Sequence, residues 1–186
     1  MLDIITCPEW EARPPKQEPQ WTGKRATSII FHHTAGHHQE IDTPGGESLL
    51  EAIRYAQAIQ NYHMDGNGWN DSGHNFLVTR AGRVLQGRWR TVRAIEEHNM
   101  VVSAHCPGQN DQIGIEHEHY GMEPMTPAQF QASARLQAWI AWQYDLKTVL
   151  PVFPHRKFFA TTCPANLVND IAGIRQAAQA YLASGC

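Results

Sequence analysis

Residues 28–36 read SIIFHHTAG, an apolar, β-branched run that ends in two adjacent histidines. β-branched and aromatic residues favour strands, so this run predicts a buried strand with His32 near its end. A second group of metal-type residues, PHRKFFATTCP, follows at residues 154–164. Imidazole and thiolate are ligands that Zn²⁺ prefers, and a catalytic zinc takes three protein ligands so that a fourth position stays open. His32, His155 and Cys163 would supply that set.

These three residues lie far apart in the chain, so they can meet only in a folded domain. A small zinc finger draws its ligands from close-spaced pairs, and the wide separation therefore favours an enzyme. Two alternatives stay open. A histidine beside a strand is often a hydrogen-bonded core or rim residue, and His32 taken alone would be interpreted in that way. A closed structural zinc site takes four ligands, and His33 or Asp71 would have to be the fourth.

Length and composition indicate an ordinary globular domain. The chain has 186 residues, enough for one hydrophobic core and too few for two, so residues 1–186 are predicted to form a single domain. The net charge of −3 gives no electrostatic footprint for nucleic acid. The sequence shows no apolar stretch of about 18 residues, and its start, MLDIITCPEWEARPP, lacks the pattern of an export signal. We expect a monomer made in the cytoplasm, with neither nucleic-acid nor membrane partners.

The cysteines do not indicate a complete disulfide framework. There are four of them, and a zinc-bound Cys163 would leave three, Cys7, Cys106 and Cys186. Pairing of Cys7 or Cys106 stays open. The proline-rich residues 12–20 predict an extended segment that wraps onto the domain.

Hydrophobic patterning predicts a mixed α/β fold. Four segments have the β-branched or alternating pattern of half-buried strands of one sheet: residues 27–33, 74–79, 83–87 and 112–118. Three longer segments have helical spacing: residues 47–63, preceded by the breaker TPGG, residues 126–147, and a run from Leu167 to Tyr181. Thr126 is the expected cap of the second helix, with Pro127 in its first turn and Gln129 reaching back in a capping box. We expect a central mixed sheet flanked by about three main helices, with His32 at a strand end where functional sites often lie.

Five segments together resemble a known family. In order along the chain they are PEWEARPP, IIFHHTAG, QNYHMDGNGWNDSGHNFLVTRAGRVLQGRW, VVSAHCPGQNDQIGIEHE and PHRKFFATTCP. Their order and spacing are similar to those of the peptidoglycan-recognition protein and type 2 N-acetylmuramoyl-L-alanine amidase family, over nearly the whole chain. The resemblance implies a sheet flanked by helices, a peptidoglycan or muropeptide substrate, and zinc-dependent cleavage of the amide between the muramic-acid lactyl group and L-alanine.

The resemblance also assigns the metal ligands. The first histidine of HHT is the family's ligand, which selects His32 over His33, and the PHR and TCP motifs add His155 and Cys163. One Zn²⁺ per chain is expected there. Zinc would polarise the scissile carbonyl and lower the pKa of a bound water toward ~7.

Two departures from the family pattern bear on the acid/base group. Many members have a tyrosine where this chain has His74, in GHNF. Glu116 stands where recognition-protein amidases commonly have a small residue, and where anhydro-muropeptide amidases and some phage lysins have glutamate. Strand alternation puts Glu116 and Glu118 on one face and His117 on the other, so alternation alone does not choose between the carboxylates. The resemblance selects Glu116 as general base, with His74 as the alternative.

The remaining site assignments also come from the resemblance. Thr161 matches a residue aimed at the reacting carbonyl, although a hydroxyl bonded to its own turn is an equal alternative. His105, Trp69 and His33 are assigned to the substrate groove, with structural support as the alternative for each. The other noted residues, interpreted as core, surface or supporting residues, are His37, His38, His63 and Trp89.

The resemblance leaves several functions to compare. The first is a wall-lytic amidase, endolysin-like, released through a host membrane pore or exported by another route. The others are a non-catalytic recognition module and a cytoplasmic amidase that recycles anhydro-muropeptides. Recognition-only members usually lack the cysteine ligand, so Cys163 favours an enzyme. EWEARPP and the helix after HHTAG favour the recognition-protein and phage-lysin branch.

Overall fold

The computed structural model describes residues 2–36 and 48–185. His37, His38, the TPGG breaker and Cys186 lie outside the described residues. Within these residues, six strands form one sheet in the order β1-β4-β3-β5-β2-β6. The strands are β1 (Ile4–Ile5), β2 (Ile29–His33), β3 (Phe76–Val78), β4 (Val84–Gln86), β5 (Ile113–His117) and β6 (Val152–Pro154).

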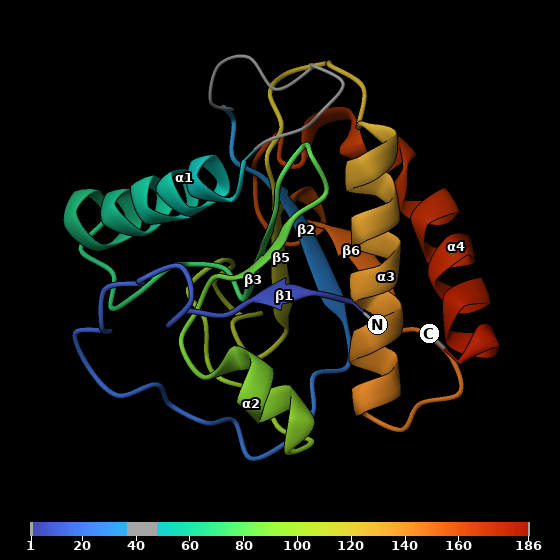
Figure 1. Ribbon diagram of the computed structural model, residues 1–186, viewed down its shortest axis with the longest axis horizontal. Helices are drawn as coiled ribbons and strands as arrows, with labels where there is room; N and C mark the ends of the chain where they lie inside the picture. Colours follow the sequence, from blue (N-terminus) through green and yellow to red (C-terminus); the bar gives the residue numbers. More distant parts are fainter. Residues whose placement is uncertain (1, 37–47, 186) are drawn as a thin grey trace.

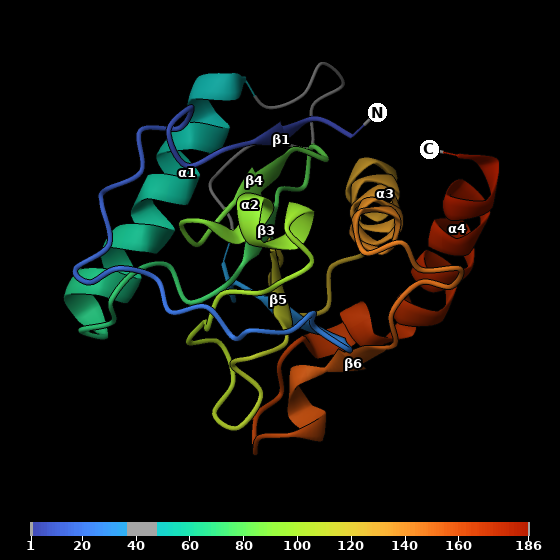
Figure 2. The same cartoon turned by 90° about the horizontal axis from the view of Figure 1, so that it is seen from below.

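The sheet is mixed, as expected. β3 and β4 pair antiparallel, and the other neighbouring strands pair in parallel. The helices of the described chain are α1 (Leu49–Asn61), α2 (Thr91–Glu96), α3 (Pro127–Gln143) and α4 (Ile171–Ser184). Figures 1 and 2 show α1 on one side of the sheet and α3 with α4 on the other. None of the described helices has the length and apolar character that a membrane crossing needs.

Each face of the sheet has its own core. The larger core packs Phe31, Phe76 and Ile115 against the helix pair α3 and α4. The smaller core, which includes Leu77 and Leu85, packs under α1. Leu77, Glu116 and His32 lie at matching positions of β3, β5 and β2. Because neighbouring residues in register share a face, His32 and Glu116 project to the α1 side.

The four expected strands and three expected helices are present, and the patterning missed three short elements. β1 has two residues, and β6 includes Pro154, which an edge strand tolerates because its outer N–H needs no partner. α2 has six residues and begins after Arg90 without a side-chain cap, so it lacks a start signal. The third expected helix begins later than predicted, because Leu167 belongs to a separate 3₁₀ turn, Ala165–Asn169.

The capping prediction for α3 is half right. The Thr126 hydroxyl accepts a hydrogen bond from Gln129 N at 3.1 Å, with Pro127 in the first turn. The Gln129 side chain does not reach back. Its amide nitrogen donates instead to the carbonyl oxygens of Val78, at 3.0 Å, and Glu118, at 2.9 Å. This fully buried amide therefore joins α3 to the ends of two strands.

Residues 12–15 have no regular secondary structure, and the N-terminal segment packs on the domain, as predicted. Arg13 N donates to the Gln60 side chain, and Lys16 N donates to Asn70 O. The described cysteines, Cys7, Cys106 and Cys163, are free thiols.

We predict that Gln129→Leu lowers the free energy of unfolding by about 1–3 kcal/mol, because it leaves the Glu118 carbonyl without its side-chain donor and removes one of the two donors of the Val78 carbonyl, the other being Glu118 N. Urea unfolding measures the change. Gln131→Ala is the matched control, since this side chain lies on the exposed surface of the same helix, and it should stay within about 0.5 kcal/mol of the wild type. Equal effects of the two substitutions would contradict the role given to Gln129.

Candidate metal centre

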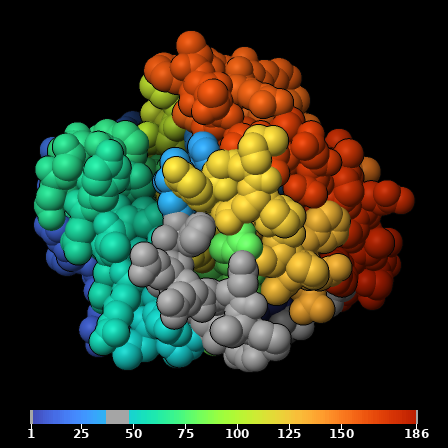
Figure 3. All heavy atoms as spheres, turned by 90° about the horizontal axis from the view of Figure 1, so that it is seen from above, coloured from blue at the N-terminus to red at the C-terminus, as the bar shows by residue number. Residues whose placement is uncertain are grey.

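The parallel pairing of β2 and β5 positions the first candidate ligand. His32 is opposite Glu116 in the register, and the backbone of the next residue, His33, continues the pairing to His117. Side chains at the carboxyl ends of parallel strands gather at one edge of a sheet, which is a common place for binding sites. Figure 3 shows the light-blue atoms that follow β2 at the surface, between the teal atoms of α1 and the yellow and orange atoms of the C-terminal half.

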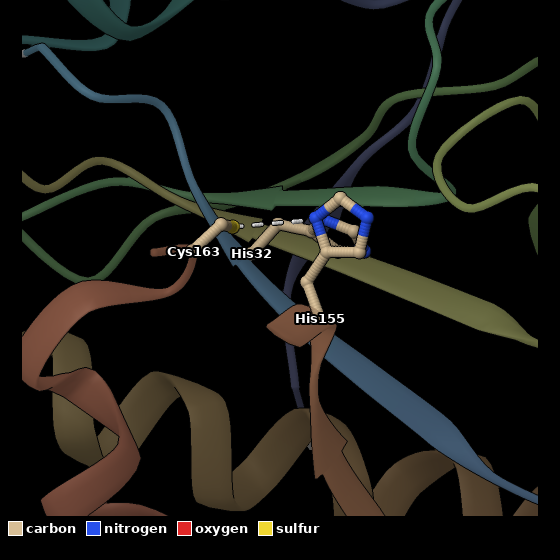
Figure 4. A group of neighbouring side chains, drawn as sticks. All are labelled: His32, His155 and Cys163. Atoms are coloured by element: carbon tan, nitrogen blue, oxygen red, sulfur yellow. Dashed lines mark hydrogen bonds between the residues drawn. The ribbon is translucent and has the colours of Figure 1, made fainter. Parts of the chain in front are cut away.

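The other two candidate ligands come from the segment after β6. His155 begins the 3₁₀ turn His155–Lys157, and Cys163 lies in the loop that follows. One ligand atom each from His32, His155 and Cys163 lie within 4.8 Å of one another. Figure 4 shows the three side chains pointing toward a common centre. The structure therefore brings together the residues that the spacing had suggested.

These residues fit a zinc ion. Cys163 Sγ lies 3.8 Å from His32 Nδ1, and the buried His155 Nε2 has no hydrogen-bond partner among the described residues. Two imidazoles and one thiolate are a donor set that Zn²⁺ accepts, with room for a fourth ligand. A metal ion bound by the Cys163 sulfur and the two imidazoles would supply the partner that the buried His155 nitrogen lacks.

A hydrogen-bond relay fixes the tautomer of His32. His105 Nε2 lies 3.1 Å from Gln112 O, and a carbonyl only accepts, so this nitrogen carries the proton. His105 Nδ1 then accepts from His32 Nε2 at 2.9 Å. The lone pair of His32 is thereby left on Nδ1, the atom that faces Cys163. Metal-bound histidines commonly use such a second hydrogen bond for orientation.

This relay changes how His105 is interpreted. The residue was assigned to the substrate groove, yet it is 4% exposed and both of its ring nitrogens are engaged. The structure places it behind His32, where it supports the candidate ligand. Gly114 of β5 makes room for the ring, because a Cβ there would lie 2.4 Å from His105 Cδ2.

Burial keeps the candidate ligands in particular protonation states. Burial, and then the neighbouring His74 and His105, lower the pKa of His32 well below its usual value. Burial also lowers the pKa of His155 and that of His105, the latter to about 3. Neutral imidazole is the form that binds metal. Burial raises the pKa of the Cys163 thiol to about 12, so in the metal-free protein the sulfur holds its proton.

The candidate acid/base residues lie beside this centre. The rings of His32 and His74 have centroids 4.5 Å apart, and His74 Nδ1 lies 2.8 Å from Glu116 Oε2. Burial favours the neutral carboxyl, but the nearby His74, His63 and His33 outweigh it and lower the pKa of Glu116. Glu118, the other carboxylate left open by alternation, lies away from this pair and accepts a hydrogen bond from Arg80 N at 2.9 Å.

Thr161 and His33 both lie next to Cys163. Thr161 Oγ1 accepts from Cys163 N at 3.2 Å, which is the turn contact expected as its structural alternative, and its own hydroxyl proton is still available for donation. His33 N donates to Cys163 Sγ at 3.4 Å, so the backbone of His33 supports the sulfur.

Two histidines that the sequence did not assign to the catalytic, metal or substrate sites also lie in this region. His63 is buried and stacks on Trp69, with ring centroids 4.8 Å apart, so Trp69 borders the cluster through His63. His117, on the other face of β5, donates from Nδ1 to His32 O at 3.2 Å and accepts from the Ser133 hydroxyl of α3 at 2.6 Å. The sequence signal for a polar contact at His117 was its position within a segment predicted as a half-buried strand. Trp89 takes no part, because its indole N–H donates to Arg13 O.

A separate groove of about 760 Å³ lies far from these residues. Its lining includes Trp139 and Trp142 of α3, Tyr181 of α4 and Ile4 of β1, and none of the candidate ligands. Size alone would favour this groove, but it lacks the converging donors of the candidate metal centre. We therefore take the histidine and cysteine cluster as the functional site.

Comparison with known proteins agrees with this geometry. The N-acetylmuramoyl-L-alanine amidase family matches residues 22–166. Peptidoglycan-recognition protein SC1a of Drosophila melanogaster is 32% identical, over 91% of this chain and 84% of its own length. The fold and the donor set define a type 2 amidase or peptidoglycan-recognition domain, and the chain belongs to the N-acetylmuramoyl-L-alanine amidase family.

Solved structures share the fold. One holds tracheal cytotoxin bound to the ectodomain complex of peptidoglycan recognition proteins LCa and LCx; it is 28% identical, with a TM-score of 0.73 over 89% of this chain and 90% of that one. Another is the N-acetylmuramoyl-L-alanine amidase LysC of Clostridium intestinale, 20% identical, with a TM-score of 0.66 over 94% of this chain and 98% of that one. At that identity, LysC supports the fold alone.

We predict that Gly114→Ala lowers zinc affinity by about 10- to 100-fold, the usual range for disturbing a hydrogen-bond partner of a ligand. The added methyl group pushes the His105 ring away from His32 and Gln112. Competition with a chelator measures the affinity. Gly173→Ala is the control, because its Cβ meets only the Phe130 ring, at 3.4 Å, and unchanged affinity is expected. Normal affinity in Gly114→Ala would refute the relay.

A second prediction concerns pH. Burial lowers the pKa of His117 to about 3 from a reference value of 6.5. Between pH 6.5 and pH 3 the unfolded chain therefore binds a proton at His117 and the folded chain does not. The stability that depends on this group is complete above pH 6.5 and decreases as the pH falls toward 3. The slope is about 1.4 kcal/mol per pH unit. His117→Asn lacks this loss, so its destabilisation relative to wild type should shrink by about 2 kcal/mol from pH 7 to pH 5 in metal-free protein. Urea unfolding at both pH values checks this, and a constant difference would contradict it.

Proposed function

We propose that this protein is a zinc-dependent N-acetylmuramoyl-L-alanine amidase, which hydrolyses the amide between the lactyl group of muramic acid and L-alanine of the stem peptide. One observation carries the proposal: His32, His155 and Cys163 converge from distant segments in a chain of this family. A recognition module has no chemical need for a buried thiol beside two imidazoles with their lone pairs available.

The substrate class rests on the relatives. SC1a is named as a peptidoglycan-recognition protein, and the LCa and LCx complex binds tracheal cytotoxin. We assign peptidoglycan or its muropeptide fragments as the substrate of this chain. Assays on intact cell walls and on a soluble anhydro-muropeptide separate a wall-lytic, endolysin-like enzyme, which we favour, from a recycling amidase.

His32, His155 and Cys163 would hold the zinc. When bound, the ion supplies Lewis acidity toward the scissile carbonyl and toward water. Glu116 is the proton acceptor: its carboxylate is 5% exposed, is kept ionised by the neighbouring imidazoles, and lies beside His32 in the register. A base in this position takes a proton from the attacking water and then gives it to the leaving amine nitrogen.

His74 and Thr161 assist in this proposal. His74 Nδ1 lies 2.8 Å from the Glu116 carboxylate, so the ring in its protonated form would pair with the charge there. The Thr161 hydroxyl accepts the Cys163 N–H and can donate its own proton toward a developing oxyanion. A neutral hydroxyl would stabilise that charge less than a lysine would.

The second candidate function is a non-catalytic recognition module. It is favoured by the names of the relatives and by the absence of the tyrosine that many members have at the position of His74. Metal content and product analysis discriminate the two: a recognition module binds muropeptides and leaves the lactyl amide intact.

The first prediction is that Cys163→Ser loses the zinc ion held by His32, His155 and Cys163, and turnover with it, because a hydroxyl is a poor replacement for a thiolate ligand. Zinc content is measured on the purified protein, and released stem peptides are identified by mass spectrometry. Cys7→Ser is the matched control, since this thiol is buried elsewhere, under α1. Full activity of metal-free protein would refute the proposed function.

The second prediction is that Glu116→Gln lowers kcat by about 10²- to 10⁴-fold while zinc stays bound, because the amide keeps the size of the side chain and removes its basicity. His74→Ala should lower kcat less. Near-normal turnover in Glu116→Gln with an inactive His74→Ala would reverse the two roles and make His74 the base.

A further inference from the structure

A second group of ligand-type atoms lies beside the candidate metal centre. His63, His74 and Glu116 are all buried, and one ligand atom of each lies within 4.8 Å of the others. His63 comes from the π-helical turn Tyr62–Gly66 that follows α1, His74 precedes β3, and Glu116 lies on β5. The group shares no residue with the set of His32, His155 and Cys163.

Two atoms of this group lack the partners that buried polar atoms require. His74 Nδ1 and Glu116 Oε2 approach to 2.8 Å, yet neither makes an aligned hydrogen bond within the described residues. The two side chains are more than nine-tenths buried. Buried polar atoms are normally hydrogen-bonded, and each exception requires an explanation. A neutral ring nitrogen and a carboxylate oxygen that approach this closely without an aligned hydrogen bond are an arrangement that a shared cation satisfies.

The chemistry of the donors selects a class of ion. Imidazole nitrogen suits Zn²⁺ and other transition metals, and a carboxylate adds an oxygen donor and the negative charge that offsets the ion. We propose that His63, His74 and Glu116 form a second divalent-cation site, next to the candidate zinc site.

His63 makes this site weaker than the first. Its Nδ1 accepts a hydrogen bond from Gly73 N at 3.1 Å, so its proton resides on Nε2 in the neutral ring. An ion that uses His63 must displace that proton or break the bond to Gly73, whereas His32 already offers a lone pair. The loss of one net hydrogen bond corresponds to an affinity difference on the order of tenfold. His74 and Glu116 are therefore the principal ligands.

A filled second site has a consequence for turnover, which rests on the proposed function. Glu116 would hold the ion through the same carboxylate that the hydrolysis uses as proton acceptor. Divalent cation beyond the first equivalent is then expected to inhibit the enzyme, and the first site provides catalysis while the second site opposes it.

The experiment is equilibrium dialysis of metal-free protein against Co²⁺, with bound metal measured by mass spectrometry and by absorption. Only the first site has a thiolate, so its occupancy gives a thiolate-to-cobalt charge-transfer band, and the second site fills without it. Wild type should bind two ions, the second about tenfold more weakly. His74→Phe and Glu116→Gln should each bind one ion and keep the band, and Cys163→Ser should bind one ion without it.

His98→Ala is the matched control, because this histidine is 45% exposed in its side chain and lies against Asp145, away from the cluster. It should bind two ions. One ion in the wild type overturns the proposal, and so do two ions in both His74→Phe and Glu116→Gln. If His74→Phe or Glu116→Gln also loses the thiolate-to-cobalt band, the result for Cys163→Ser decides. One ion bound to Cys163→Ser supports the second site, and no bound ion overturns the proposal. Dialysis needs no turnover, so an active enzyme that binds one ion refutes this site alone. A protein that binds two ions in dialysis, yet has no turnover when given one equivalent of zinc, refutes the amidase alone.

Discussion

The parallel pairing of β2 with β5 is the constraint on which the candidate site depends. It sets His32 directly opposite Glu116, and the neighbouring pairing of β3 with β5 sets Leu77 in the same row. One face of these strands therefore carries the candidate ligand and the candidate base, while the other carries Phe31 and Ile115 into the core beneath α3 and α4. A shift of one residue in this register would exchange the two faces and bury the apolar side chains where the metal chemistry is expected.

The strand edge is held by polar contacts as well as by the core. The Gln112 carbonyl orients His105, His105 orients His32, and His117 ties the backbone of His32 to Ser133 of α3. The directions of these bonds follow because His105 and His117 each use one ring nitrogen to donate to a backbone carbonyl, which can only accept, and this leaves the other nitrogen of the neutral ring as an acceptor. A buried histidine cluster of this kind is stable only when its rings are neutral, and neutral rings are also what a metal requires. The same burial therefore serves both folding and ligand binding.

The proposed amidase and the recognition proteins that it resembles share one fold. The relatives support the sheet and helices over most of the chain. On the α1 side of the sheet, this chain has the buried His74 beside Glu116, with the imidazole of His63 close to both. The α1 side of the sheet therefore has a second set of metal-ligand atoms beside those of His32, His155 and Cys163. Catalysis and inhibition by metal would then depend on the same carboxylate.

The sequence by itself determined the strands and helices with strong periodicity, the Thr126 cap, and the three residue types suited to zinc. These follow from local pattern and from ligand chemistry, which need no neighbours. It did not determine β1, β6 or α2: β1 has two residues, β6 includes Pro154, and α2 begins without a side-chain cap, so none of them has a clear sequence signal.

Only the tertiary structure decided which face each site residue uses and what it bonds. Alternation left Glu116 and Glu118 equivalent, and contacts from other segments separated them: Glu116 approaches His74, and Glu118 accepts from Arg80. The capping role predicted for Gln129 was wrong for the same reason, since its partners are the carbonyls of Val78 and Glu118, at the ends of two strands. For His105, the contact with His32 favours structural support, one of the two roles that the sequence left open. Hydrogen bonds between remote segments leave no periodic trace in a sequence, because only the packing of the sheet against its helices brings the two groups together.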